Sequence, residues 1–196
     1  MKNRQRIISL AAAAGMFASA AFASDDDGLR FEGGIGATPV GRINNNGTAT
    51  PTSDDFPEAN SVLGVNPGGA PWIIKSLRAR IGADGRISAK GEGLLLAGGN
   101  NIGTRGGPRQ VLASLFCRAA PVAPATTGAA IGPFDSTFVD LDADGDFEIR
   151  SSLTDSTGAV PPSPCGDTID NRPVLLIRTV AGGAPGAWFA AGILKE

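Results

Sequence analysis

The sequence contains no histidine, no tyrosine and only two cysteines among its 196 residues. Without histidine there is no Ser–His or Cys–His nucleophile pair, no imidazole metal ligand and no proton shuttle with a pKa near neutrality. Two cysteines are too few for a four-cysteine zinc or iron–sulfur site. Carboxylates are therefore the groups left for acid–base catalysis, and oxygen atoms are the ligands left for a metal.

Charged residues are also sparse, at 18% of the chain, whereas glycine and proline are abundant, with 28 and 14 residues. Apolar residues make up 42% of the sequence, which is enough for one modest globular domain with its own core. The same composition excludes a collagen repeat, a coiled coil and a disordered tail.

The segment 1–23 is typical of a cleaved secretory signal peptide. Three basic residues lie among the first six, and an apolar, alanine-rich stretch follows at 7–22. The small residues Ala21 and Ala23 fit cleavage before Ser24. An uncleaved membrane anchor is the alternative, but the stretch is short for a spanning helix of about 20 residues. We therefore predict a secreted or periplasmic protein with no membrane span after signal removal.

Removal of this segment leaves 14 basic residues against 19 acidic ones, a net charge of −5. General nucleic-acid binders need a basic footprint, so we expect no nucleic-acid partner. An oxidising destination favours disulfide formation, and two cysteines allow one connectivity. We predict the bond Cys117–Cys165, and two separate buried thiols are the alternative.

Short apolar-alternating runs between glycine and proline clusters dominate the chain after residue 71. The segment 24–71 is predicted to hold a strand at Leu29–Gly36 and then a long loop over 41–60. No run keeps a helical apolar period over three turns, whereas period-two alternation recurs. The expected strands are Trp72–Gly82, Arg86–Leu96, Gln110–Arg118, Thr137–Asp142, Asp146–Leu153, Pro173–Arg178 and Ala187–Leu194.

These segments predict an all-β fold in which residues 24–196 form one domain. We expect a single antiparallel β-sandwich, immunoglobulin-like or of a related Greek-key topology, with long Gly/Pro-rich loops and one disulfide. Its main strands should lie in 72–196. The run Val174–Ile177 is apolar on both faces, so it is predicted to be a central strand.

The Ala-Asp-Gly sequence at 83–85 predicts a hairpin with a defined register. A two-residue loop would place the apolar residues of the two strands on opposite faces. A three-residue loop instead pairs Ile81 with Ile87 and Ala79 with Ala89, all on one face. The three-residue loop is therefore the prediction.

A second Ala-Asp-Gly sequence at 143–145 predicts a hairpin of the same build. On its outer face Asp142 would lie opposite Asp146, and Asp140 opposite Glu148. Like charges directly opposite each other destabilise a strand pair. We therefore expect this repulsion to be compensated.

The stretch Asp140–Gly145 resembles the first half of an EF-hand calcium loop. The position of the closing glutamate is occupied by Ser151, and strands rather than helices are expected on both sides. A solvated acidic turn is one alternative. Another is pairing with the basic outer face of the first hairpin, formed by Arg78, Arg80, Arg86 and Lys90. The candidate Ca²⁺ ligands are Asp140, Asp142, Asp144, Asp146 and Glu148.

The glycine-rich loop 97–109 is a candidate anion-binding site. Glycines let backbone N–H groups turn toward an anion, and arginines add bidentate contacts. The loop fits neither the P-loop nor the dinucleotide-binding pattern, and a purely structural connection is the alternative. The candidate residues are Asn100, Asn101, Thr104, Arg105 and Arg109.

No motif in the chain identifies an activity. We expect a non-enzymatic binding or assembly module without a required cofactor, which meets a protein partner through a sheet edge or face. One alternative is a carboxylate-dependent polysaccharide hydrolase, for which Glu32 and Glu92 are the carboxylates within small or apolar strand segments. The other alternative is a calcium-stabilised structural module.

Overall fold

The fold is built from antiparallel β-strands, as the alternation of apolar residues predicted. The computed structural model describes residues 28–45, 47, 50, 53, 55–119, 128–166 and 171–195, and the predicted signal peptide at 1–23 lies outside them. No α-helix occurs in the described part of the chain. Accordingly, these residues include no helix with the length and apolar character needed to cross a membrane.

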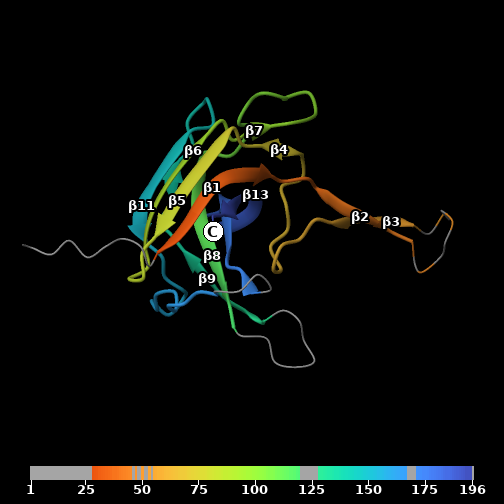
Figure 1. The fold of residues 1–196 in the computed structure, drawn as a ribbon. Helices are drawn as coiled ribbons and strands as arrows, with labels where there is room; N and C mark the ends of the chain where they lie inside the picture. The colour runs from red at the N-terminus through yellow and green to blue at the C-terminus, as the bar shows by residue number, and fades with distance from the viewer. Residues whose placement is uncertain are drawn as a thin grey trace, which may run out of the picture.

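Nine strands form one curled sheet (Figure 1). They are β1 (Leu29–Gly36), β5 (Ser76–Ile81), β6 (Arg86–Glu92), β8 (Gln110–Arg118), β9 (Ala130–Asp135), β10 (Val139–Asp140), β11 (Phe147–Ser152), β12 (Val174–Ala181) and β13 (Ala184–Leu194). The order is β10-β8-β12-β13-β1-β5-β6-β11, and β9 pairs with β8. The all-β antiparallel fold is confirmed. A sandwich of two stacked sheets is not confirmed, because strand pairing joins all nine strands into one sheet.

Two small sheets accompany the curled sheet. One pairs β4 (Trp72–Ile73) with β7 (Leu95–Leu96), and the other pairs β2 (Val40–Asn44) with β3 (Phe56–Ala59). The β2–β3 hairpin extends away from the curled sheet as an arm (Figure 1). The prediction of a loop throughout 41–60 is therefore wrong. The polar residues that suggested a loop bond across the arm instead, because Glu58 accepts hydrogen bonds from Arg42 and Asn44.

The first Ala-Asp-Gly hairpin has the predicted register. Ile81 pairs with Ile87 and Ala79 with Ala89, and all four side chains are buried. Gly85 has a φ of 79°, the left-handed conformation that the three-residue loop requires. Local alternation and turn chemistry were sufficient to predict this part of the fold.

The predicted central strand is also confirmed. Strand β12 lies between β8 and β13, and its residues Leu175, Leu176 and Ile177 are fully buried. Consecutive side chains of a strand point to opposite faces. Burial of all three therefore means that both faces of β12 are covered.

The second Ala-Asp-Gly turn, at 143–145, joins strands that do not pair with each other. Asp140 lies opposite Gln110 on β8, and Glu148 lies opposite Lys90 on β6. The predicted pairing of Asp140 with Glu148 is therefore wrong. The physical reason is that the observed arrangement separates the two carboxylates and places a cation beside Glu148.

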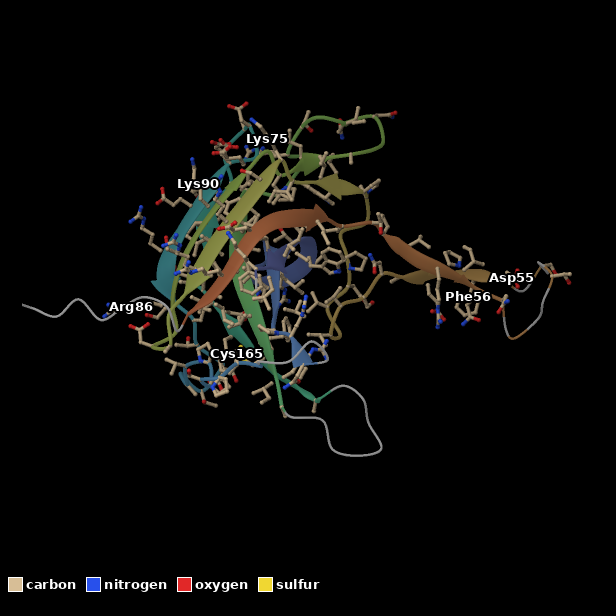
Figure 2. The ribbon with its side chains drawn as sticks, in the orientation of Figure 1. Asp55, Phe56, Lys75, Arg86, Lys90 and Cys165 are labelled. Atoms are coloured by element: carbon tan, nitrogen blue, oxygen red, sulfur yellow. A yellow bond between two sulfur atoms is a disulfide. The ribbon has the colours of Figure 1, made fainter. Side chains whose placement is uncertain are left out.

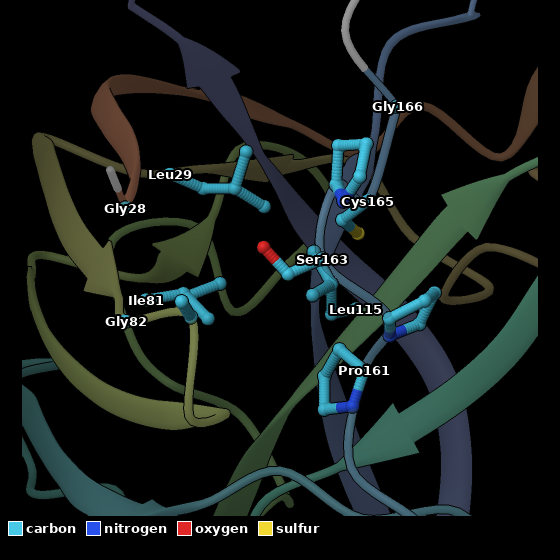
Figure 3. Close-up of a pocket in the computed structure, with 12 residues that line it drawn as sticks. Gly28, Leu29, Ile81, Gly82, Leu115, Pro161, Ser163, Cys165 and Gly166 are labelled. Carbon is cyan, nitrogen blue, oxygen red and sulfur yellow. The ribbon is translucent and has the colours of Figure 1, made fainter.

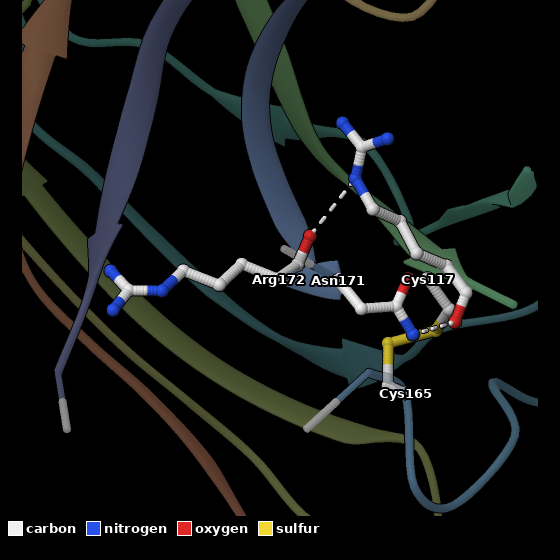
Figure 4. Close-up of a disulfide and its surroundings, with 5 residues drawn as sticks. Cys117, Cys165, Asn171 and Arg172 are labelled. Carbon is white, nitrogen blue, oxygen red and sulfur yellow. Dashed lines mark hydrogen bonds between the residues drawn. A yellow bond between two sulfur atoms is a disulfide. The ribbon is translucent and has the colours of Figure 1, made fainter. Parts of the chain in front are cut away.

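The predicted disulfide is present and ties a proline-rich connector to β8 (Figure 4). Cys117 lies in β8 and Cys165 in the connector, and both are buried. The backbone N–H of Arg118 donates to the carbonyl of Cys165 at 3.3 Å. Asn171 Nδ2 donates to the carbonyl of Arg118 at 3.1 Å, and Arg118 Nε donates to the carbonyl of Arg172 at 3.2 Å. The connector is thus held to β8 by both covalent and hydrogen bonds.

Replacing both cysteines by alanine should lower the free energy of unfolding by about 4 kcal/mol. The reason is that the disulfide joins residues 48 positions apart and so restricts the unfolded chain. Thermal and urea denaturation of the Cys117→Ala, Cys165→Ala protein measure the loss. Adding a reductant should destabilise the parent protein but leave the double variant unchanged. Equal stability of the two proteins under oxidising conditions would contradict the prediction.

Candidate functional site

The outer face of β1, β5, β6 and β11 carries charged side chains in rows that run across the strands. In one row Glu32 lies opposite Arg78, Arg78 opposite Lys90, and Lys90 opposite Glu148. Lys195 Nζ adds a hydrogen bond to Glu32 at 2.7 Å. Each acidic residue in this row therefore has a basic neighbour. We call it the balanced row.

The neighbouring row contains three arginines and no acidic residue. Arg30 lies opposite Arg80, Arg80 opposite Ser88, and Ser88 opposite Arg150. Adjacent strands are about 4.8 Å apart, so the four backbone positions span about 14 Å. Like charges on facing strand positions destabilise a sheet. This arginine row is therefore an unfavourable feature for folding alone.

Nearby carboxylates neutralise the arginine row only in part. Arg150 Nε donates to Glu148 at 2.6 Å, and the flanking Arg86 lies 3.3 Å from Asp84. Both contacts are largely exposed, and exposed ion pairs contribute only about 0–1 kcal/mol each. No carboxylate of the described residues forms an ion pair with Arg80. The guanidinium of Arg80 is therefore not neutralised by direct carboxylate contact within this part of the chain.

A hollow of about 830 Å³ lies over this row. Ligand sites have volumes of about 300–1,000 Å³, so the hollow has room for a small molecule or a section of a chain. Figure 2 shows Arg86 and Lys90 projecting from this side of the sheet, away from the β2–β3 arm. The polar side chains that line the hollow are Arg30, Arg80, Asp84, Arg86, Ser88, Arg150, Ser151 and Ser152.

The two carboxylates singled out for hydrolysis are held in their ionised form. The hydrogen bond from Lys195 lowers the pKa of Glu32, and the charges of Arg78 and Arg80 act in the same direction. The hydrogen bond from Lys90, at 2.9 Å, lowers the pKa of Glu92. A general acid in glycoside hydrolysis needs the opposite shift. Neither carboxyl is therefore prepared for that role.

The carboxylates of the acidic turn bond to backbone N–H groups. Asp142 Oδ1 accepts from the N–H of Asp144 at 2.9 Å and from the N–H of Asp146 at 2.8 Å. Asp146 Oδ1 accepts from the N–H of Gly93 at 2.8 Å. These bonds fix the turn and anchor it to the segment after β6.

Two of the other three candidate calcium ligands, Asp140 and Glu148, point to other partners. Asp140 accepts from Gln110 Nε2 at 3.4 Å, whereas Glu148 accepts from Arg150. Within the described ranges, no three acidic, histidine or cysteine side chains are grouped to hold a metal. Calcium binding by this turn stays a prediction, because the structure does not bring its five candidate ligands together.

The candidate anion loop 97–109 is braced by its own polar side chains. Arg105 Nη1 donates to the carbonyl of Leu141 at 2.6 Å, and Thr104 Oγ1 donates to the carbonyl of Asn101 at 2.8 Å. These bonds support the structural interpretation of the loop, and anion binding there stays a prediction. The other candidates are exposed: Asn100, Asn101 and Arg109.

The sequence predicted four of the six basic residues on this face. It placed Arg78, Arg80, Arg86 and Lys90 on the outer face of one hairpin, and it offered pairing of that hairpin with the acidic one as an alternative. The pairing of β11 with β6 places Glu148 of the acidic set opposite Lys90 of the basic hairpin. It did not find Arg30 and Arg150. The alternation of apolar and polar residues in β1 and β11 indicated that both side chains face outward. Only the order of the strands, however, shows that they lie in one row with Arg80.

Comparisons of this chain with protein-family models, curated proteins and solved structures find no match. Fold similarity therefore offers no functional assignment. The chemistry of the described side chains is what indicates a function for this protein.

Asp142→Ala should lower the free energy of unfolding by about 1–2 kcal/mol, because two backbone N–H groups of the turn lose their acceptor. Asp144→Ala is the matched control in the same turn, since its side chain accepts none of these bonds. Urea denaturation of both variants measures the difference. Equal losses of stability in the two variants would show that general acidic charge, rather than the cap, supports the turn.

Proposed function

We propose that this protein is an exported, non-enzymatic binding module that holds an anionic ligand on the outer face of β1, β5, β6 and β11. The observation that carries the proposal is the arginine row, with Arg30, Arg80 and Arg150 on adjoining strands around one hollow. Guanidinium groups bind carboxylate, sulfate and phosphate through paired N–H donors. The disulfide supports the export part of the proposal, because such bonds persist in oxidising compartments.

A bound anion would offset the unfavourable electrostatics of the row. In the free protein, arginines on facing positions repel each other, and solvent and salt screen the repulsion only in part. An anion between them replaces this repulsion with attraction. Paired strands also hold the arginine backbones in place before binding, which reduces the ordering cost.

Nucleic acid fits this face less well than other polyanions. Proteins that bind single strands stack bases on aromatic side chains, and among the described residues none that lines the hollow is aromatic. The hydrolase alternative is also less favoured, since the pKa values of Glu32 and Glu92 are shifted downward. Binding without turnover agrees better with these side chains.

The binding proposal is tested with dextran sulfate and uncharged dextran as matched probes. The protein should bind dextran sulfate, with affinity falling as salt rises, and should not bind dextran. Arg80→Gln together with Arg150→Gln should weaken binding at least tenfold, because each lost charge-assisted contact is worth about 1.5–3 kcal/mol. Isothermal titration calorimetry measures the affinities.

Arg109→Gln is the control for this experiment, since Arg109 is an exposed arginine in the other candidate anion site. It should bind dextran sulfate as the parent does. Loss of binding in Arg109→Gln, with binding retained in the double variant, would move the site to the loop 97–109. Equal affinity for dextran and dextran sulfate would overturn the proposal altogether.

A second candidate function, self-assembly, is favoured by the β2–β3 arm. Both of its strands are sheet edges, and Val40, Ile43 and Phe56 are about half exposed on it. A lone two-stranded hairpin is marginally stable in water, so burial against a partner would stabilise it. Ile35 and Ile193 on the curled sheet are exposed to a similar degree. We propose that the arm of one copy packs on the apolar surface of a second copy.

This assembly predicts a dimer that Ile43→Asp together with Phe56→Asp converts to a monomer, since buried charges oppose apolar contact. Sedimentation equilibrium measures the mass of each protein. Ile102→Asp is the control, because Ile102 is 64% exposed but lies in a loop away from the arm. A monomeric parent protein at high concentration, or a dimer that survives the double substitution, would refute self-assembly through the arm.

A further inference from the structure

A second pocket lies at one end of the curled sheet, and because leucine, isoleucine and proline side chains form much of its wall, we call it the apolar pocket (Figure 3). Its volume is about 220 Å³. One wall comes from the strand ends at Leu29 and Ile81, and the other comes from Leu115 and the proline-rich connector 161–166. Figure 3 shows the Ser163 hydroxyl projecting between these walls. This pocket suits a short apolar group, because it is smaller than an ordinary ligand site.

The apolar pocket and the arginine-lined hollow meet at the end of the sheet. Successive side chains of a strand point to opposite faces, so Leu29 and Ile81 face inward while their neighbours Arg30 and Arg80 face outward. A ligand lying over the rim would reach both surfaces. The residues common to the two cavities are Gly28, Leu29, Ile81, Gly82 and Ala83.

We infer that the ligand is an anionic amphiphile, with its charged head over the arginine row and a short alkyl chain, or the end of a longer one, in the apolar pocket. This inference rests on the proposed function and names the class of ligand. Two observations carry it: charge complementarity with Arg30 and Arg80, and the continuity of their hollow with walls of aliphatic and proline side chains. An ion alone would leave the apolar pocket unfilled.

The disulfide gives this pocket one of its walls. Cys165 lines the pocket and is bonded to Cys117 on β8, next but one to Leu115. The bond therefore holds the connector at a fixed position opposite Leu29 and Ile81. Loss of the disulfide should widen the pocket. It should therefore weaken binding of the ligand's alkyl chain more than binding of its charged head.

The test compares inorganic sulfate with butyl, hexyl and octyl sulfate, each below its micellar concentration, by isothermal titration calorimetry. Affinity should rise up to about fourfold for each methylene that enters the pocket, and then level off. Octyl glucoside has the same chain but an uncharged head, so it should bind much more weakly than octyl sulfate.

Pocket-filling variants locate the alkyl chain. Ser163→Trp should fill the pocket and remove the chain-length dependence, while leaving dextran sulfate binding unchanged. Ala83→Trp at the shared rim is a second variant with the same expected loss of chain-length dependence. Ser156→Trp is the control, because Ser156 is exposed in a turn and lines neither cavity. Circular dichroism confirms that each variant is folded.

The outcomes separate this inference from the proposed function. If the protein binds dextran sulfate but its affinity for alkyl sulfates does not depend on chain length, the proposal of an amphiphilic ligand is wrong and the anion site is retained. Chain-length dependence that persists in both folded pocket variants would also overturn it, because the chain would lie elsewhere. Equal affinities for octyl glucoside and octyl sulfate would overturn the proposal that the arginines bind the charged head of the ligand. Absence of dextran sulfate binding in the parent protein would overturn the proposed function itself.

Discussion

The pairing of β1 with two different strands is the constraint on which the curled sheet depends. Its first half, through Glu32, pairs with β5, whereas β13 pairs with Phe31 and then with the second half, from Gly34. The register shifts between these halves, where Gly33 has a φ of 93° that L side chains rarely adopt. Through this one strand, the β5-β6-β11 group is joined to the buried β8-β12-β13 group. The same pairing sets Arg30 opposite Arg80.

Local sequence signals predicted those parts of the fold that local physics determines. The loop at 83–85 and its register followed from turn chemistry and alternation, and β8 begins and ends at the predicted residues. The order of the strands did not follow, because pairing between distant segments leaves no local pattern. For the same reason the turn at 143–145 was predicted well, but the divergence of its strands was not.

In the candidate site, too, local sequence predicts the orientation of single side chains but not which distant strands bring them together. Alternation alone placed Arg78 and Arg80 on an outer face, and it would place Arg30 and Arg150 on outer faces too. The arginine row exists only because β1 and β11 flank the β5–β6 hairpin in one register. Similarly, the apolar pocket forms only because the connector near Cys165 lies opposite Leu29 at the end of the sheet. That juxtaposition depends on tertiary packing and not on any segment by itself.

The two outer-face rows provide an internal comparison for the functional argument. They lie on the same four strands, so the fold requires solvent-facing polar side chains in both rows. The balanced row places Glu148 beside Lys90, whereas the arginine row has Ser88 between Arg80 and Arg150. An acidic residue at position 88 would neutralise that row without disturbing the core. The facing arginines Arg30 and Arg80 are thus a local conflict of the kind that is common at binding sites, and this supports the proposed anion site.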